Sequence, residues 1–245
     1  MKDSTISSEK HIFDELAYTV GFFLGDGSLY SGPFISTRNG KTYYHNDVVF
    51  GCGDLDAIER VQSQIELVFG KRYNIQHRIL NTGSTYYVLS THRRPIFNFF
   101  SVNTAMRTVI PHYYFGASPE VRKELCSGLM DSDGHCMETV LPGGGPRWQL
   151  GFSNGNLGLV QDTASIMQKL GVKVGNLTAS KKAGFKDVHI LHPNARSFYE
   201  NGFRFHVARK QARLDRYVAH VLGSETLRTT PPTRGEDIVP PCAKA

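Results

Sequence analysis

The chain has 245 residues, of which 40% are hydrophobic and 20% are charged, and its formal net charge is +6. This composition supports a folded core and excludes a mainly disordered chain. The longest apolar stretch, from Leu16 to Gly25, is shorter than the ~20 residues of a membrane-spanning helix, and the first residues lack the apolar stretch of a secretory signal, so we expect a basic intracellular protein without membrane association.

The first hundred residues predict helices and hairpins in alternation. Residues 11–25 are mostly apolar or small and end in Gly-Asp-Gly, which predicts a helix with a glycine stop. Aromatic and β-branched residues around turn signals then predict two hairpins, and apolar residues at helical spacing predict two more helices. The expected elements are strands at 28–37 and 42–52, a helix from Leu55 to Val68, strands at 73–80 and 85–91, and a helix at 95–102.

The same order of elements returns about 100 residues later. The segment AYTVGFFLGDGSL at 17–29 is similar to ELCSGLMDSDGHC at 124–136, and isolated positions further on also correspond. The corresponding positions are Gly21 and Gly128, Asp26 and Asp133, Gly27 and Gly134, Gly70 and Gly171, and Phe97 and Phe198. This self-similarity predicts two diverged copies of one unit.

The second copy predicts a middle helix from Leu157 to Leu170 and a hairpin with strands at 172–180 and 185–192. We therefore expect an α+β fold built from two αββαββα units related by pseudo-twofold symmetry. The expected boundaries are a first half at 10–102, a linker at 103–119, a second half at 120–222 and a disordered tail at 223–245.

Each motif helix carries a stripe of mostly small residues at successive i+4 positions. The stripes are Ala17, Gly21 and Gly25 in the first helix and Glu124, Gly128 and Ser132 in the second. Small residues at this spacing let two helix backbones approach closely. We expect the two helices to pack side by side, since a helix packed only beneath its own sheet would favour Leu or Ile along the stripe.

The expected helix pair brings Asp26 and Asp133 together at its C-terminal end. A carboxylate there faces the negative end of the helix dipole, and two neighbouring carboxylates repel each other unless a divalent cation lies beside them. Oxygen ligands suit Mg²⁺, which completes its coordination with water and substrate phosphate oxygens. One Asp-Gly pair alone indicates an ordinary turn, but its recurrence in matching contexts favours a metal site for phosphodiester chemistry.

The cysteines and histidines predict no zinc site. Four cysteines are present without a CxxC pair, and no pair of histidines accompanies a cysteine pair at zinc-finger spacing. We expect reduced thiols with a structural role.

The two motifs, TVGFFLGDG at 19–27 and CSGLMDSDG at 126–134, resemble the paired motifs of single-chain LAGLIDADG homing endonucleases. The resemblance implies a monomer with two four-stranded antiparallel sheets that form a saddle over the DNA major groove. It also implies that Asp26 and Asp133 bind the metal ions, with Gly25 and Ser132 as main-chain neighbours. Leu24 departs from the motif, which often has an acid at that position, whereas Asp131 retains one.

The family also places a basic residue near each metal site. The segment at 205–214 resembles the KQ-x-x-L type segment of the family, which makes Lys210 a candidate catalytic residue. Arg107 is the corresponding, poorer candidate in the first half. The alternative for both residues is an ordinary solvated charge on a helix.

Polar and basic residues are concentrated in the predicted hairpins, where side chains can contact base edges and phosphates. Any one of them can equally belong to a solvated sheet surface, but the set indicates a nucleic-acid surface. The candidate DNA-binding residues are Ser28, Tyr30, Arg38, Lys41, Tyr43, His45, Arg72, Asn74, Gln76, Arg78, His135, Arg147, Gln149, Lys173, Thr178, Ser180, Lys181, Lys182 and Lys186.

The resemblance implies a site-specific endonuclease that hydrolyses both strands of DNA and leaves 3′ overhangs. We expect double-stranded DNA as its partner, Mg²⁺ as its cofactor with Mn²⁺ as a substitute, and Ca²⁺ to bind without supporting efficient cleavage. No obligate protein partner is expected. Two alternatives on the same scaffold stay open: a maturase that binds intron RNA, and a DNA-binding regulator that does not cleave.

Overall fold

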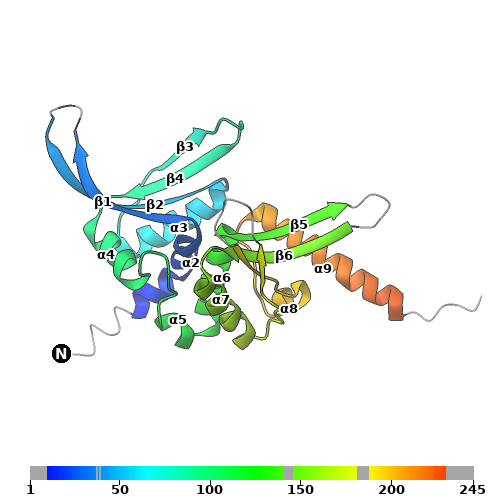
Figure 1. The fold of residues 1–245 in the computed structure, drawn as a ribbon. Helices are drawn as coiled ribbons and strands as arrows, with labels where there is room; N and C mark the ends of the chain where they lie inside the picture. Colours follow the sequence, from blue (N-terminus) through cyan, green and yellow to red (C-terminus); the bar gives the residue numbers. More distant parts are fainter. Residues whose placement is uncertain (1–9, 37, 39, 141–145, 181–187, 230–245) are drawn as a thin grey trace, which may run out of the picture.

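Two sheets lie on either side of a central pair of helices, α2 and α6 (Figure 1). The structure is a computed structural model that describes residues 10–36, 38, 40–140, 146–180 and 188–229, with side chains described as far as residue 223. No helix in these ranges is long and apolar enough to span a membrane.

The first unit contains a four-stranded antiparallel sheet in the order β1-β2-β4-β3. A helical turn at 10–15 precedes α2 and is separated from it by Leu16. The elements are α2 (Ala17–Asp26), β1 (Gly27–Ile35), β2 (Thr42–Cys52), α3 (Leu55–Phe69), β3 (Ile75–Ile79), β4 (Thr85–Thr91) and α4 (Arg94–Asn103).

The second unit repeats this arrangement with its strands in the order β5-β6-β8-β7. The short helix α5 (Tyr113–Gly116) lies in the connection between the units. The elements are α6 (Pro119–Ser132), β5 (Gly134–Val140), β6 (Pro146–Asn154), α7 (Leu157–Lys169), β7 (Thr178–Ser180), β8 (Val188–Leu191), α8 (Ala195–Glu200) and α9 (Ala208–Thr229). The expected duplicated α+β fold is confirmed.

Three details differ from the sequence-based expectation. The strand expected at 172–180 is regular only over β7, because the residues before it follow an irregular path in which Gly175 N–H donates to His192 and Asn194 N–H donates to Lys173. Helix α9 continues to Thr229, so residues 223–229 are helical rather than part of a tail. Finally, the glycine stop at Gly27 does not use the left-handed conformation in which helices commonly end at glycine, because φ is −79° and the backbone is extended.

Gly27 is needed for space. A Cβ at this position would lie 2.1 Å from the Phe23 ring and 2.6 Å from the Phe23 carbonyl oxygen. The corresponding Gly134 has the same restriction, since its Cβ would lie 2.4 Å from the Met130 carbonyl oxygen. In each unit the chain can therefore turn directly from the motif helix into the first strand of the sheet.

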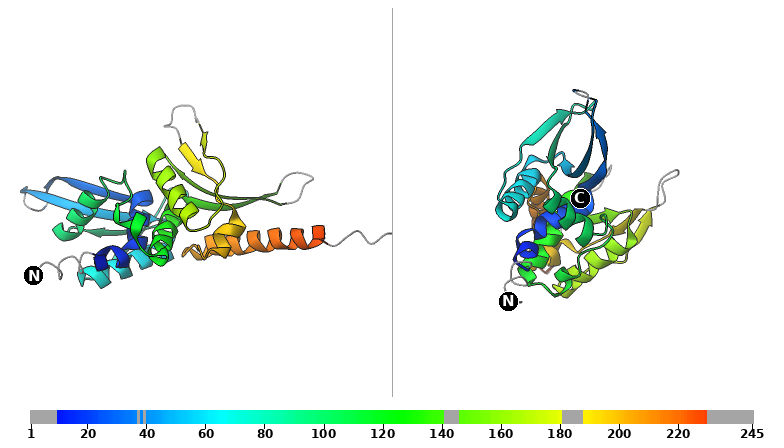
Figure 2. Two further views of the ribbon diagram at one scale, coloured as in Figure 1. Left: turned by 90° about the horizontal axis from the view of Figure 1, so that it is seen from below. Right: turned by 90° about the vertical axis from the view of Figure 1, so that its left-hand side faces the viewer.

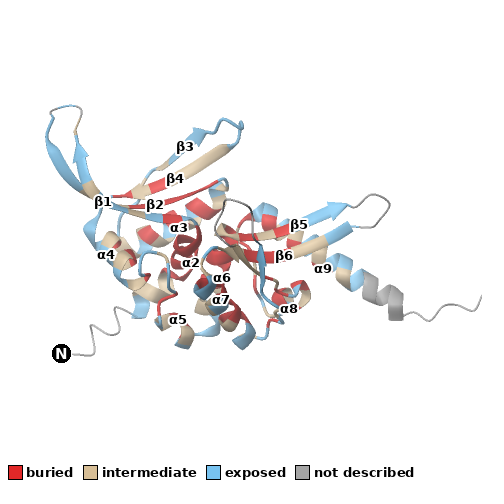
Figure 3. Cartoon of the chain, in the orientation of Figure 1, coloured by how far each residue is buried: buried red, intermediate tan, exposed pale blue. Residues whose placement is uncertain are grey.

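The core surrounds the helix pair. Every residue of α2 from Ala17 to Gly25 is buried, as expected for a helix covered on all sides, and Figure 3 shows α2 and much of α6 as buried. In the first unit, Phe23 of α2 packs against Phe50 of β2 and Phe100 of α4, with ring centroids 5.8 and 4.5 Å away. Burying side chains of this size contributes about 1.5–3 kcal/mol each.

The helices cover one face of each sheet. In the first sheet, Val48, Phe50 and Leu89 point into the core, so the residues that alternate with them occupy the opposite face. In the second sheet, α9 extends along β5 and β6 (Figure 2), and the Tyr217 ring stacks on Trp148 at 5.4 Å. Each sheet thus keeps one face that α2, α3, α6 and α9 do not cover.

The start of α9 also ties the two units together. The Arg209 guanidinium donates to both carboxylate oxygens of Asp54, at 2.5 and 2.7 Å. The Ala208 N–H donates to Asp56 at 2.7 Å. Asp54 and Asp56 lie at the N-terminal end of α3, so the first turn of α9 is anchored to the other half of the molecule.

Candidate metal centre and nucleic-acid interface

The helices α2 and α6 are in direct main-chain contact. A Cβ on Gly21 would lie 2.0 Å from the Leu125 carbonyl oxygen, and a Cβ on Gly128 would lie 2.1 Å from the Tyr18 carbonyl oxygen. A Cβ on Gly25 would lie 2.0 Å from the Ser132 Oγ. No side chain larger than hydrogen fits at these three positions, which is why the small-residue stripe allows this packing.

Of the other stripe residues, Ser132 faces Gly25, and Ala17 and Glu124 differ from each other. Ala17 is fully buried. Glu124 is partly exposed and accepts a hydrogen bond from Arg60 of α3 at 2.5 Å, while the His206 Nε2 lies 3.3 Å away. Its carboxylate contributes an ion pair at the edge of the helix contact.

Asp26 and Asp133 lie next to each other where the two motif helices end. Asp26 is the last residue of α2, Asp133 caps α6, and the preceding Gly25 approaches Asp133 so closely that a Cβ there would lie 3.2 Å from its Oδ2. The Asp26 side chain reaches solvent, but the surrounding protein removes part of its hydration. This desolvation is the larger cause, and repulsion from Asp133 the smaller one, of a rise in the pKa of Asp26 to about 6.

The two carboxylates have different partners. The Asn154 side-chain amide, at the end of β6, donates to the Asp133 Oδ2 at 2.6 Å. Burial raises the pKa of Asp133, and this hydrogen bond lowers it in part. By strand register, the position of Asn154 corresponds to Cys52 in the first unit, whose Sγ instead donates to the Asp54 carbonyl oxygen at 3.2 Å.

Two basic residues hold the ends of the motif helices. The Lys210 Nζ, which is almost fully buried, donates to the carbonyl oxygens of Met130, Asp131 and Gly134 at 3.1, 2.6 and 2.7 Å. The Arg107 Nε and Nη2 both lie 3.4 Å from the Leu24 carbonyl oxygen. Arg107 follows two other non-glycine residues with positive φ, Ala105 and Met106, and this left-handed turn directs its side chain toward α2.

Lys210 is the candidate catalytic residue from the sequence, and in the structure its ammonium group contacts main-chain acceptors. All three of its ammonium protons have main-chain acceptors, so it stabilises the end of α6 and acts on Asp26 and Asp133 through their electrostatic environment. Burial lowers the pKa of Lys210, and the neighbouring Asp131 carboxylate raises it in part. We describe Lys210 as a positioning residue.

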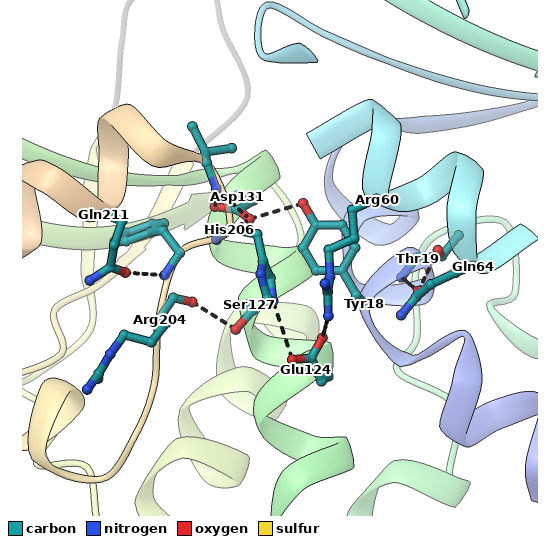
Figure 4. Close-up of polar contacts among 12 residues, drawn as sticks. Tyr18, Thr19, Arg60, Gln64, Glu124, Ser127, Asp131, Arg204, His206 and Gln211 are labelled. Carbon is teal, nitrogen blue, oxygen red and sulfur yellow. Dashed lines mark hydrogen bonds and ion pairs between the residues drawn. The ribbon is translucent and has the colours of Figure 1, made fainter. Parts of the chain in front are cut away.

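Asp131 connects α6 to two other segments (Figure 4). Its carboxylate is buried and accepts hydrogen bonds from the Tyr18 hydroxyl at 3.0 Å and from the main-chain N–H groups of His206 and Val207 at 2.8 and 3.3 Å. Burial outweighs these bonds and raises the pKa of Asp131 to about 6. The contacts fix the start of α9, which carries Lys210.

Most candidate DNA-binding residues of the first unit lie on the sheet face away from the core. Direct cross-strand partners share a face, and the pairs Ser28 with Val49, Gln76 with Val88 and Arg78 with Tyr86 connect that face across the sheet. The candidates on this face are Ser28, Tyr30, Tyr43, His45, Gln76 and Arg78. Arg38, Lys41 and Asn74 lie in adjoining loops, and Arg38 and Asn74 are exposed.

Arg72 does not belong to this set. Its guanidinium donates to Glu66 of α3 at 2.8 Å, which draws the side chain toward the helix layer. Arg72 therefore pairs with an acidic residue of a helix although it lies next to a strand. This contact depends on where α3 ends, so the spacing of residues in the sequence could not indicate it.

The second sheet has a similar polar face. His135, Arg147 and Gln149 of β5 and β6 alternate with the buried Cys136, Leu150 and Phe152, and Thr178 and Ser180 of β7 are exposed. Lys173 is exposed in the segment before β7. Lys181, Lys182 and Lys186 lie outside the described residues.

Two residues of the site were not anticipated from the sequence. Asn154, at the end of β6, orients Asp133. The sequence feature that could have indicated it is a polar residue at the end of the second strand after the motif. Tyr86 lies opposite Arg78, whose guanidinium carbon is 5.1 Å from the centroid of the tyrosine ring, and so adds an aromatic group to the polar face of the first sheet.

Comparisons with solved structures identify the fold. I-DmoI in complex with DNA and Ca is 18% identical with a TM-score of 0.56, over 84% of this chain and 98% of that chain. A mutant of I-SmaMI is 10% identical with a TM-score of 0.56, over 86% and 92%. Mesophilic variants of the homing endonuclease I-DmoI are 16% identical with a TM-score of 0.52, over 78% and 93%.

The fold is that of the LAGLIDADG homing endonucleases. The expected resemblance is thereby confirmed at the level of structure. No protein-family model and no curated protein matches the sequence. At these identities the likeness concerns the homing-endonuclease fold alone, and the function has to be argued from the site.

Proposed function

We propose that this protein is a site-specific endonuclease that makes a double-strand break in DNA by metal-dependent hydrolysis of phosphodiester bonds, leaving 3′ overhangs. The observation that carries the proposal is the pair of carboxylates, Asp26 and Asp133, held side by side at the ends of two helices in main-chain contact. The uncovered polar faces of both sheets support DNA as the partner. Solved relatives of this fold include I-DmoI in complex with DNA.

The carboxylate pair suits a hard divalent cation. Both groups have a raised pKa because desolvation disfavours their charged forms, and repulsion from Asp133 adds to the shift at Asp26. Asp26 and Asp133 would hold a cation whose charge offsets that repulsion, and oxygen ligands favour Mg²⁺, with Mn²⁺ as a substitute. When bound, the ion would supply an activated water and neutralise charge on the phosphate. We expect Ca²⁺ to support binding without efficient cleavage.

The protein's own residues would prepare this site in three ways. Gly21, Gly25 and Gly128 allow the helix approach that brings the carboxylates together. Asn154 orients Asp133, while Lys210 and Arg107 offset the negative ends of the two helices. With one carboxylate from each half, a monomer would contain the groups needed to cut both strands.

The proposal is tested with Asp26→Asn, Asp133→Asn and the control Asp162→Asn, which changes an acid on α7. Each protein is incubated with a randomised duplex library and Mg²⁺, and the cut products are sequenced. We expect the wild type and the control to cut a defined site, and the two site variants to lose at least a hundredfold in rate while retaining binding in Ca²⁺. Full cleavage by both site variants contradicts the assignment.

The library experiment and an RNA competition assay separate the two alternatives. A library that is bound specifically by the wild type but never cut favours a DNA-binding regulator. Preference for structured RNA over duplex DNA in a competition assay favours a maturase.

A further inference from the structure

Among the described residues, one group of three His, Cys, Asp or Glu side chains lies close enough together to hold a metal ion, and it is remote in sequence from the motif aspartates. His45 and Asp47 are two residues apart on β2, and His92 directly follows β4. Their ligand atoms all lie within 4.8 Å of one another.

The strand register brings these three side chains together. His45 and Asp47 share a face of β2 because successive strand residues alternate. Val48 pairs with Thr91, so Asp47 and His92 occupy the next position of the same antiparallel ladder. The group is therefore built on two neighbouring strands of the sheet, not on a loop.

The distances around Asp47, one of them a hydrogen bond to His92, bracket the ligand spacing of a small ion. Its Oδ1 lies 2.6 Å from the His92 Nδ1 and 3.8 Å from the His45 Nδ1. Ligands of a tetrahedral Zn²⁺ ion, at about 2.0–2.2 Å from the metal, are about 3.3 Å apart. One distance is shorter than this value and one is longer, and the His92 side chain, which is 63% exposed, has room to adjust.

Both imidazole rings face the Asp47 carboxylate. The His45 ring packs against Phe34 with centroids 5.0 Å apart. The His92 ring packs edge-on against the His45 ring, with centroids 5.4 Å apart. Both histidines present Nδ1 to the same carboxylate oxygen. Two imidazoles and one carboxylate form a ligand set that suits Zn²⁺ and disfavours Mg²⁺, which prefers oxygen ligands.

We propose that His45, Asp47 and His92 form a second metal site, which takes a divalent transition-metal ion such as Zn²⁺ and is separate from the carboxylate pair. Three protein ligands leave one coordination position, which faces away from the core. An ion at this site links β2 to the end of β4 and stabilises the first sheet. The site does not depend on the proposed endonuclease function.

The test uses the full chain without a histidine tag and Co²⁺ as a spectroscopic probe, with excess Mg²⁺ present to occupy the carboxylate pair. The variants are His92→Ala and Asp47→Asn, and the matched control is His77→Ala, which removes an exposed histidine from β3 of the same sheet. We expect the wild type and the control to bind one equivalent with the visible absorption of tetrahedral Co²⁺. Zn²⁺ should displace this ion.

Both site variants should bind Co²⁺ at least tenfold more weakly, and Zn²⁺ should raise the melting temperature of the wild type and the control but not of the variants. Circular dichroism and thermal unfolding without metal establish that every variant is folded. Equal binding by all four proteins, no binding by the wild type, or a thiolate-to-cobalt charge-transfer band that indicates cysteine ligands would each overturn the proposal. DNA cleavage is not a readout, so failure here leaves the proposed function unaffected.

Discussion

The Lys210 Nζ lies 2.6 Å from the main-chain oxygen of Asp131, at the C-terminal end of α6. Asp131 corresponds in the internal repeat to Leu24, whose main-chain oxygen is the acceptor for Arg107. Two basic residues from outside the repeated motif thus reach equivalent carbonyl groups. Because a helix C-terminus carries partial negative charge, each cation offsets repulsion that the nearby aspartate would otherwise increase.

Replacing Lys210 with Met should destabilise the protein by about 2–4 kcal/mol, because the methionine keeps the apolar stem but leaves buried carbonyl groups without their donor. Chemical denaturation measures the free energy of unfolding. The control is Arg216→Met on the same helix, which removes only an exposed ion pair with Glu138 and should cost less than about 1 kcal/mol. Equal losses in the two variants would mean that the Lys210 hydrogen bonds contribute little.

Gly21→Ala and Gly128→Ala should each destabilise the fold by about 3 kcal/mol or more, since the added methyl group meets a carbonyl oxygen of the opposite helix near 2 Å. Gly223→Ala is the control, because a Cβ there has no neighbour within 4 Å. It should be neutral or stabilise α9 by about 0.5–1 kcal/mol. Thermal unfolding distinguishes these cases, and an unchanged melting temperature for both motif variants would refute the main-chain contact.

Asn154→Ala should make cleavage of the two DNA strands unequal. Loss of its hydrogen bond leaves Asp133 without its amide donor, while Asp26 keeps its surroundings. We expect one strand to be cut about 10-fold more slowly, the size of effect given by a hydrogen bond to a charged group. Nicked circles should then accumulate from a supercoiled plasmid that carries the target site. The control Gln168→Ala removes an exposed amide from α7, and equal slowing of both strands by Asn154→Ala would contradict this assignment.

Asp131 should make folding stability depend on pH. Its folded-state pKa of about 6 lies above the ordinary value of 3.8, so the folded protein binds this proton more tightly than the unfolded chain. Its contribution therefore favours folding at low pH and is lost as the pH rises from about 4 to about 6, by up to about 3 kcal/mol at 1.36 kcal/mol per pKa unit.

Asp131→Asn should remove this dependence while keeping an acceptor for the His206 and Val207 N–H groups. The measurement is the free energy of unfolding of both proteins from pH 4 to pH 7.5 in a chelator, taken as a difference so that the shifts at Asp26 and Asp133 cancel. Parallel curves for the two proteins would show that Asp131 titrates normally.

The features that could be predicted most directly from the sequence are those that occur in both copies of the internal repeat. Gly21 and Gly128 predicted the helix contact because a hydrogen in place of a side chain is useful only where another backbone approaches. The sequence also predicted the hairpins that carry the polar candidates, and the observed register places Tyr30 and Gln149 each on the uncovered face of its sheet.

Features that depend on contacts between distant segments could not be predicted in this way. The three carbonyl acceptors of Lys210 and the pairing of Arg72 with Glu66 depend on the orientation of α9 and on the end of α3. The group of His45, Asp47 and His92 required the register of β2 against β4, which no local pattern specifies. Local propensity indicates an element, but its neighbours are determined by packing.

The main-chain contact between Gly21, Leu125, Gly128 and Tyr18 limits how halves of such proteins can be exchanged. In a chimera of the first half with a foreign second half, the foreign motif helix needs a glycine at the position of Gly128. It also needs a main-chain carbonyl that can contact Gly21, as the Leu125 carbonyl does here. The anchoring of Arg209 to Asp54 imposes a second requirement of charge. Recombination between duplicated genes of this kind would therefore retain the contact between α2 and α6. The sheets can vary more freely, because their uncovered faces do not have to pack against the other half.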